Sequence, residues 1–240
     1  GDRLSLQKVS PLYMIELINV SKDFASGISA LHNVSLHIGK EEFVFIVGAS
    51  GAGKTTLLKM LYREERPTAG KVVVDRVNVA ELDSKQVPFL RRNIGVVFQD
   101  FKLLPKMTVY ENVAFALRVT GAPRSTIRRK AMQAIELVGM LRRVNAFPEE
   151  LSGGEKQRAC IARAIVNNPP ILLADEPTGN LDPTTTWDIL QLLDKVNKRN
   201  TTVLIATHNK SIVDEMKKRV VELENGRLVR DQQLGMYRVQ

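Results

Sequence analysis

The chain has 240 residues, of which 44% are hydrophobic and 25% are charged, and this composition is ordinary for a globular protein. The chain contains 35 Lys and Arg against 26 Asp and Glu, which gives a net charge of +9. Because basic stretches are not interleaved with aromatic residues, we expect a solvated basic surface and no nucleic-acid partner. The single cysteine, Cys160, excludes an intrachain disulfide and a cysteine-cluster metal site, and no apolar run approaches the ~20 residues of a membrane span.

The first part of the chain predicts two strands. Residues 1–13 show no strong periodicity, and we expect a leader or an expression remnant there. Residues 14–20 and 31–38 alternate between apolar and polar side chains, as strands do. Phe24 lies between them, where its ring could stack on an adenine base or could plug the end of a strand. The residues alone leave both roles open.

A phosphate-binding loop follows a third predicted strand, the apolar run at residues 43–47. Residues 48–55 fit the pattern G-x-x-x-x-G-K-[ST] without a gap, and a helix is expected to begin directly after them. The N–H groups of such a turn and the helix dipole hold phosphate oxygens, while Lys54 should reach the β- and γ-phosphates and Thr55 should bind Mg²⁺. A glycine turn that binds nothing is the alternative, which the adjacent Lys–Thr pair disfavours. The residues expected to hold the nucleotide here are Gly48, Ser50, Gly51, Ala52, Gly53, Lys54, Thr55 and Thr56.

The middle of the chain changes from strands to helices. Short strands are predicted at 71–74 and 77–79, and a buried strand at 96–98 ends at Gln99, which could be a turn residue or could reach Mg²⁺ or the attacking water. Helical periodicity at 108–119 and 125–138 then predicts an α-helical subdomain inserted at about residues 100–158. Beyond it, small and apolar neighbours indicate that Cys160 is a packed thiol in a helix.

A second candidate anion-binding feature closes the predicted helical segment. Ser152, Gly153 and Gly154 precede a helix expected at residues 155–167, and the free N–H groups at a helix start can bind an anion. Ser-Gly-Gly is also common in loops. The feature therefore supports a binding function only in combination with the other motifs.

Acidic and imidazole side chains follow two later strands at the same predicted edge of the sheet. The apolar strand at 171–175 ends in Asp175 and Glu176, and two carboxylates there need a cation or a proton partner. Asp175 is placed for the metal, and Glu176 is placed to orient or deprotonate an attacking water. In a chain without a phosphate loop, the alternative interpretation would be plausible, namely that the strand ends in two solvated acids. A strand at 202–206 leads to His208, which we expect to contact the γ-phosphate.

The last part of the chain contains a turn, a helix and a hairpin. Asp182 belongs to a turn that leads into an amphipathic helix. Strands at 220–223 and 227–229 flank an Asn-Gly pair, which is a hairpin signal. Residues 231–240 are expected to form a C-terminal tail.

Together, in chain order, these motifs resemble the nucleotide-binding subunit of ATP-binding cassette (ABC) proteins, and the resemblance covers about residues 14–230 as a single domain. It implies an α/β fold with a P-loop NTPase (RecA-like) core, an N-terminal antiparallel β subdomain and an inserted α-helical subdomain. It also implies Mg²⁺-dependent hydrolysis of ATP to ADP and phosphate. The residues implied as catalytic are Lys54, Gln99, Glu176 and His208, and those implied at the metal are Thr55, Gln99 and Asp175.

The resemblance further implies that two copies pair head to tail in the ATP state and bury two ATP molecules. Each ATP would lie between the phosphate loop of one copy and Ser152, Gly153 and Gly154 of the other. Phe24 matches the aromatic residue that stacks on adenine in the family. Asp182 matches a residue of the loop that follows the two carboxylates.

Residues 61–67, 97–105 and 108–112 resemble the bacterial cell-division members of the family. That resemblance implies a peripheral protein at the cytoplasmic face of the cell membrane, at the division site, whose contact with the membrane is indirect. Its membrane partner would resemble FtsX and control peptidoglycan hydrolases. An ABC transporter ATPase of the lipoprotein-release or macrolide-exporter type is the alternative. Candidate contacts to the partner, which could instead pack within the chain, are Phe101, Leu103 and Leu104.

Overall fold

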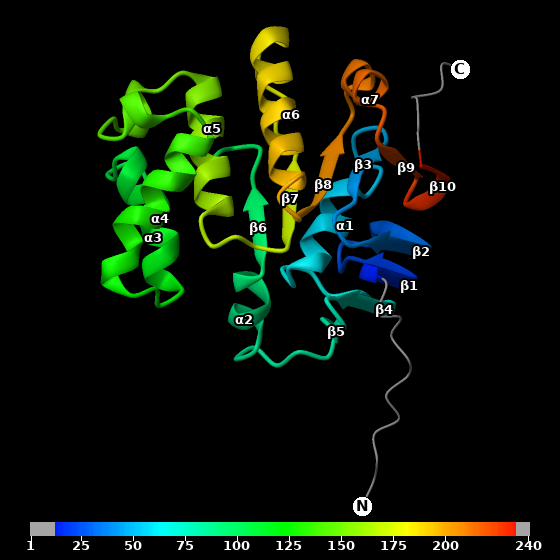
Figure 1. The fold of residues 1–240 in the computed structure, drawn as a ribbon. Coiled ribbons are helices and arrows are strands. Elements are labelled where there is room, and N and C mark those ends of the chain that lie inside the picture. Colours follow the sequence, from blue (N-terminus) through cyan, green and yellow to red (C-terminus); the bar gives the residue numbers. More distant parts are fainter. Residues whose placement is uncertain (1–12, 234–240) are drawn as a thin grey trace, which may run out of the picture.

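The computed structural model describes residues 13–233, so nearly all of the expected leader and most of the expected tail lie outside the described residues. Two sheets and a group of helices form the structure (Figure 1). The strands are β1 (Tyr13–Asp23), β2 (Ser29–Gly39), β3 (Phe43–Val47), β4 (Ala69–Val74), β5 (Val77–Asn78), β6 (Ile94–Val97), β7 (Ile171–Asp175), β8 (Thr202–Thr207), β9 (Arg219–Glu224) and β10 (Arg227–Gln232). The helices are α1 (Lys54–Leu61), α2 (Val87–Arg92), α3 (Val109–Val119), α4 (Arg124–Leu137), α5 (Gly153–Ile165), α6 (Pro183–Asn197) and α7 (Lys210–Met216), with short 3₁₀ turns η1 (Leu141–Arg143) and η2 (Pro148–Glu150).

The larger sheet has the strand order β10-β9-β3-β8-β7-β6, and β9, β3, β8, β7 and β6 run parallel. Alternate residues of β3 belong to two different core clusters, because a parallel sheet of this type is covered on both faces. The strand therefore reads as a continuous apolar run. Because parallel strands share one carboxyl edge, the residues that follow β3, β6, β7 and β8 meet there, where α/β proteins bind their ligands.

The N-terminal sheet has the order β2-β1-β4-β5 and is antiparallel. Its inward side chains pack with α1 and with one face of the larger sheet in a single core cluster. The predicted antiparallel β subdomain is confirmed. The turn between β1 and β2 carries Phe24 toward the phosphate loop that follows β3.

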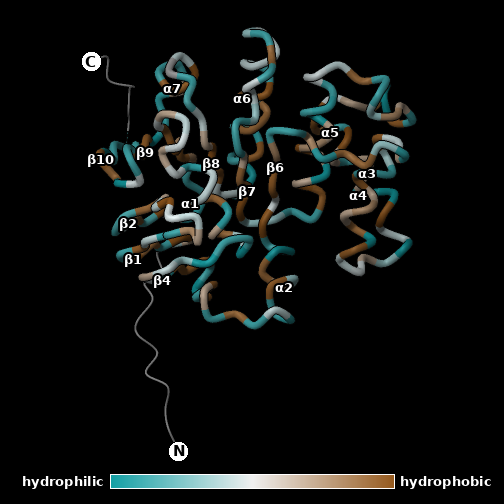
Figure 2. The backbone as a smooth tube through the Cα atoms, turned by 180° about the vertical axis from the view of Figure 1, so that it is seen from behind, coloured by the Kyte–Doolittle hydropathy of each residue, from teal (hydrophilic) through white to brown (hydrophobic). Residues whose placement is uncertain are grey.

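The predicted helical subdomain is also confirmed, and α3, α4 and α5 gather on the side of the larger sheet opposite the N-terminal sheet in both views (Figures 1 and 2). Capping boxes start two of these helices, at Thr108 for α3 and at Ser152 for α5. Helix α5 begins at Gly153, two residues before the expected start. It also crosses residue 158, the expected limit of the subdomain, and packs against β6 and α6, so it connects the helical part to the core.

The sequence patterns predicted neither helix α2 nor helix α7, and they placed the end of strand β10 too early. Helix α2 has six residues and α7 has seven, and both are too short to show a full helical period. Strand β10 continues to Gln232, so the first residues of the expected tail are in a strand. None of the helices in the described part of the chain has the length and apolar character needed to cross a bilayer.

A buried arginine ties the C-terminal hairpin to the rest of the fold. Arg219 of β9 is 8% exposed and donates to both carboxylate oxygens of Asp231 on β10 at 2.9 and 2.8 Å. It also donates to Glu42 at 2.5 Å and to the His37 carbonyl at 2.8 Å. The hydrogen bonds to the Asp231 and Glu42 carboxylates, that to Asp231 first, raise the pKa of the guanidinium. The hairpin, the N-terminal sheet and the start of β3 thus share one cation.

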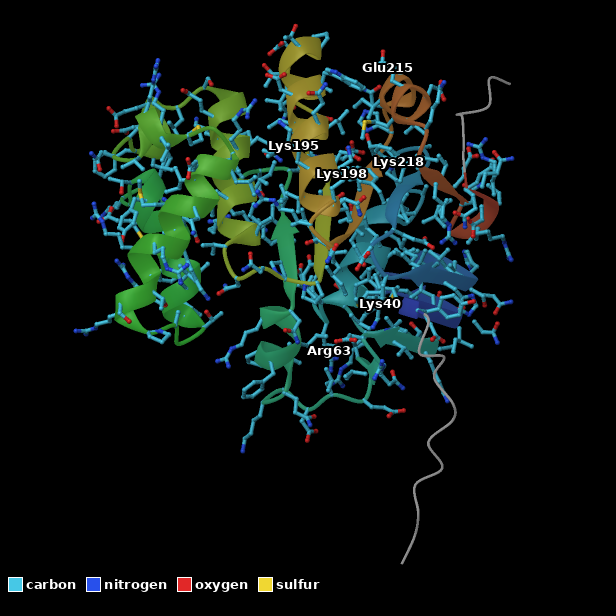
Figure 3. All side chains as sticks on the ribbon, in the orientation of Figure 1. Lys40, Arg63, Lys195, Lys198, Glu215 and Lys218 are labelled. Carbon is cyan, nitrogen blue, oxygen red and sulfur yellow. The ribbon has the colours of Figure 1, made fainter. Side chains whose placement is uncertain are left out.

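Replacing Arg219 with Ala is expected to lower the free energy of unfolding by about 3 kcal/mol, because two carboxylates and a carbonyl lose their buried partner. Urea unfolding followed by circular dichroism measures the change. Lys198→Ala is the control, since Lys198 directly follows the end of α6 (Figure 3) and its side chain is 71% exposed. Its ion pair with Asp194 should contribute less than about 1 kcal/mol. Equal effects of the two substitutions would contradict this account.

Candidate active site

One cleft of about 680 Å³ collects most of the residues that the sequence predicts for nucleotide binding. Segments that are far apart in the sequence line it: the β1–β2 turn, the phosphate loop, and the ends of β6, β7 and β8. The predicted residues among its lining are Phe24, Ser50, Gly51, Gly53, Lys54, Thr55, Thr56, Gln99, Glu176 and His208. The fold therefore brings the predicted catalytic and phosphate-binding residues to one place.

The phosphate loop has a conformation that glycine favours. Gly48, Gly51 and Gly53 have φ values of 150°, 79° and 101°. A Cβ atom on Gly53 would lie 2.5 Å from the Ala30 carbonyl oxygen, so the loop passes directly against the β2 strand. Ala52 is buried and its N–H donates to the Ala49 carbonyl at 3.1 Å, which places it behind the cleft wall.

The side chain of Lys54 bends back toward the first residues of the phosphate loop. Its side chain is buried, and Nζ donates to the Gly48 and Ala49 carbonyls at 2.8 and 2.9 Å. The ammonium group thus lies inside the curve of the loop, beside the first N–H groups of α1. A phosphate in this curve would meet a positive side chain and the positive end of a helix dipole together.

Asp175 and Thr55 form an oxygen-rich corner beside the loop. Burial raises the pKa of Asp175, and a hydrogen bond with the Thr55 side chain opposes that shift. The Asp175 Oδ1 atom is buried without a hydrogen-bond partner, which is the condition of a carboxylate that fits a cation. Gln99 lines the cleft and also an adjoining one that contains Asp175. A hydroxyl, a carboxylate and an amide oxygen are ligands that suit Mg²⁺, which is commonly held by few protein groups together with phosphates.

Glu176 and His208 form a pair across the ends of two neighbouring strands. His208 Nδ1 lies 2.7 Å from Glu176 Oε1. Glu176 has φ of 45°, an unusual conformation for a non-glycine residue, and its N–H donates to the Ala206 carbonyl of β8 at 2.9 Å. This bond continues the parallel pairing of β7 with β8, and the positive φ of Glu176 then turns the chain, so that Glu176 lines the cleft. The prediction from sequence placed both residues at this edge but did not anticipate their contact.

Phe24 lies at the mouth of the cleft, where its ring is partly exposed. The ammonium of Lys22 lies 4.7 Å from the centre of the ring. Several neighbouring residues that line the cleft were not predicted as binding residues, because they are small or belong to an ordinary turn. They are Ser26, Ile28, Ser29, Ala30 and Ala49.

The remaining predicted binding residues do not line this cleft. Ser152 and Gly153 are exposed at the start of α5, where the Ser152 hydroxyl accepts from the Glu155 N–H at 3.3 Å. Asp182 caps α6 by accepting from the Thr185 N–H at 3.0 Å. A Cβ atom on Gly154 would lie 2.5 Å from the Thr185 side chain, so the two helix starts lie side by side. Within one chain, therefore, these residues and the phosphate loop are separate.

Comparison with known proteins agrees with this arrangement. The profile of the ABC transporter family matches residues 31–179. The chain is 53% identical to the cell division ATP-binding protein FtsE of Bacillus subtilis (strain 168), over 93% of this chain and 98% of that protein. It is 46% identical to the protein of the same name in Escherichia coli (strain K12), over 90% and 97% of the two chains. This chain belongs to the ABC transporter family.

Solved structures of ABC cassettes share the fold. The dimeric structure of MJ0796, described as a bacterial ABC transporter cassette, has a TM-score of 0.84 and 39% identity, and the match covers 93% of this chain and all of that one. A second dimeric structure of MJ0796, in a post-hydrolysis state bound to ADP and Pi, gives the same TM-score at 38% identity. The predicted ABC nucleotide-binding fold, ATP binding and ATPase class are confirmed. The FtsE matches favour the cell-division members over the transporter ATPases.

Proposed function

We propose that this ABC cassette is the ATP-hydrolysing subunit of an FtsEX-like complex at the cytoplasmic face of the cell membrane, at the division site. Two copies close on two ATP molecules, and the closure acts on a membrane partner that resembles FtsX and controls peptidoglycan hydrolysis. The observation that carries the proposal is the Glu176–His208 pair facing the phosphate loop across one cleft, in a chain with FtsE relatives at about half identity.

In the proposed reaction, Glu176 accepts the proton of the water that attacks the γ-phosphate. An ionised carboxylate only accepts hydrogen bonds, so His208 donates to it from Nδ1 and holds it in place. With Nδ1–H used in this way, Nε2 can donate to a phosphate oxygen only in the imidazolium form. Lys54 stabilises the negative charge of the β- and γ-phosphates. Bound by Thr55, Gln99 and Asp175, Mg²⁺ would supply further neutralisation of that charge.

The proposal needs a second copy because part of the predicted site faces away from the first. Ser152, Gly153 and Gly154 begin α5, and the N–H groups of that helix start can hold phosphate oxygens. A head-to-tail partner would bring them to the other side of the ATP bound at the phosphate loop. Phe24 would stack on the adenine, and Asp182 would lie beside Ser152, Gly153 and Gly154, next to the same interface.

An apolar groove of about 590 Å³ lies between α2, α3 and the loop after β6, and we assign it to the membrane partner. Phe101 and Leu103 pack against the core of this chain, so two of the three residues expected to contact the partner serve the chain itself. Leu104 lines the groove together with Phe115 and Val119. The basic residues that line it are Arg91, Arg92, Lys102 and Arg163, while Glu64, the carboxylate among its described lining residues, pairs with Lys59. An apolar segment bearing an acidic residue fits this chemistry.

The test is co-purification with the membrane partner. Val119→Glu places a charge in the groove at a side chain that is 62% exposed, so the fold and the soluble ATPase activity should be unchanged. Capture of an FtsX-type membrane protein from detergent-solubilised membranes should fall at least about tenfold, which corresponds to roughly 1.4 kcal/mol of binding energy. Val229→Glu is the control, because Val229 is 51% exposed on β10 outside the groove. Capture of a transport permease in place of an FtsX-type protein would overturn the cell-division proposal.

A further inference from the structure

The loop after β6 contains a tight turn that helix α5 holds in place. Phe101 and Lys102 have φ values of 60° and 47°, so two consecutive non-glycine residues are in the left-handed region. That conformation is unfavourable for residues with a Cβ atom, and it persists where surrounding contacts over-determine it. The Lys102 N–H donates to the Asp100 carbonyl at 2.6 Å, and the Phe101 ring packs into the core.

Two side chains of α5 supply the contacts that hold this turn. Arg163 donates from Nη1 to the Lys102 carbonyl at 2.5 Å and from Nη2 to the Phe101 carbonyl at 2.9 Å. The Cys160 thiol donates to the same Phe101 carbonyl at 2.9 Å. Burial raises the pKa of the Cys160 thiol to about 12, so the sulfur keeps its proton and remains a donor. The planar guanidinium spans two adjacent carbonyls, which a lysine ammonium does less well.

The position of the turn relates it to both parts of the proposed site. Gln99 lies two residues before Phe101 and lines the cleft beside Glu176. The same helix begins, at its other end, with Gly153 and Gly154, which would complete the partner copy's site. Arg163 also lines the groove assigned to the membrane partner. Helix α5 therefore contacts the loop that follows Gln99, begins with the glycines proposed to face the second copy, and lines the groove.

We propose that Arg163 is a positioning residue that sets Gln99 in the active site by clamping the Phe101–Lys102 turn. The inference rests on the proposed function, because it concerns the role of Gln99 in ATP hydrolysis. Cys160 assists as a second donor to the turn. Without the clamp, the strained turn relaxes and the Gln99 amide leaves the position from which it can contact the metal or the attacking water.

The test is a double-mutant cycle on steady-state ATP hydrolysis by the full chain. Arg163→Ala should lower kcat about tenfold, while the Kd for a fluorescent ATP analogue stays within about twofold. In a Gln99→Ala background, Arg163→Ala should produce less than about a twofold further loss, because residues that act through one another are not additive. Arg163→Lys should recover only part of kcat. Arg158→Ala is the control: Arg158 is also on α5 but donates to the Val138 carbonyl and Asp188, and it should keep kcat within about twofold.

A second pair of variants tests the same proposal in case Arg163→Ala does not fold. Cys160→Ser keeps a donor to the Phe101 carbonyl and should retain kcat, whereas Cys160→Ala removes the donor and should lower kcat. In the Gln99→Ala background, Cys160→Ala should cause no further decrease in kcat. Losses that multiply with Gln99→Ala, or a loss of ATP affinity equal to the loss of kcat, would overturn the proposal. These outcomes differ from failure of the proposed function, which would appear as undiminished turnover in Glu176→Gln.

Discussion

Replacing Glu176 with Gln is expected to lower ATP turnover by about 10²- to 10⁴-fold, the range typical for loss of a positioned general base. The amide cannot take the proton of the attacking water. Its carbonyl oxygen can still accept from His208 Nδ1, which lies 2.7 Å from the carboxylate in the native site, so the pair keeps its shape. ATP should therefore still bind, and an ATP-bound dimer should accumulate. Phosphate release and gel filtration with ATP measure the two effects.

His208→Ala separates the two members of this pair. If Glu176 is the base and His208 orients it, removal of the imidazole should lower turnover less than Glu176→Gln does. The structure supports this order, because the Glu176 N–H bond to the Ala206 carbonyl holds the main chain of Glu176 independently of His208. A larger loss in His208→Ala than in Glu176→Gln would assign the base to the histidine. Steady-state hydrolysis within a few-fold of wild type in Glu176→Gln would reject the assigned base.

Replacing Lys54 with Ala is expected to weaken ATP binding by at least about tenfold. Hydrogen bonds of a charged group contribute about 1.5–3 kcal/mol each, and about 1.4 kcal/mol corresponds to a factor of ten in affinity. The loss has two sources: the phosphates lose a buried cation, and the Gly48 and Ala49 carbonyls lose the donor that holds the loop. Titration with a fluorescent ATP analogue measures the affinity.

Lys59→Ala is the matched control for Lys54→Ala. Lys59 lies on the same helix, but it pairs with Glu64 at 2.9 Å and lines the adjoining cleft instead of the phosphate loop. Its removal should leave the Kd for ATP within about twofold, as expected for a partly exposed ion pair. Equal losses in the two variants would mean that general charge, not the position of Lys54, determines affinity. Normal affinity in Lys54→Ala would count against the role assigned to the loop.

The elements nearest the phosphate loop were predictable from local patterns. The apolar run at 43–47, the glycines after it and the following helix appear in the structure as β3, the loop and α1. Helices α3 and α4 are long enough to show their period, and the structure confirms them within one residue at either end. The parallel sheet was implied by buried apolar strands, and its shared edge explains why residues predicted separately lie in one cleft.

The contacts between these elements were not predictable in the same way. The Glu176–His208 hydrogen bond depends on how β7 and β8 are aligned, which no local pattern states. The role of Phe101 depends on packing: its apolar side chain suited both an exposed contact and the core, and tertiary structure decided for the core. Arg219 had no sequence signal, since its contacts depend on the pairing of β9 with β10 and on Glu42, which is distant in the chain.

By itself, the sequence determined which segments form the phosphate loop and the strands around it, and it predicted which residues bind phosphate, because turn geometry and side-chain periodicity are local properties. Only the tertiary structure decided which of those residues meet. It joins Lys54, Gln99, Glu176 and His208 in one cleft and leaves Ser152 and Gly153 exposed on another helix start. The physical reason is that long-range contacts are set by the packing of whole elements, whose relative positions depend on the complete core.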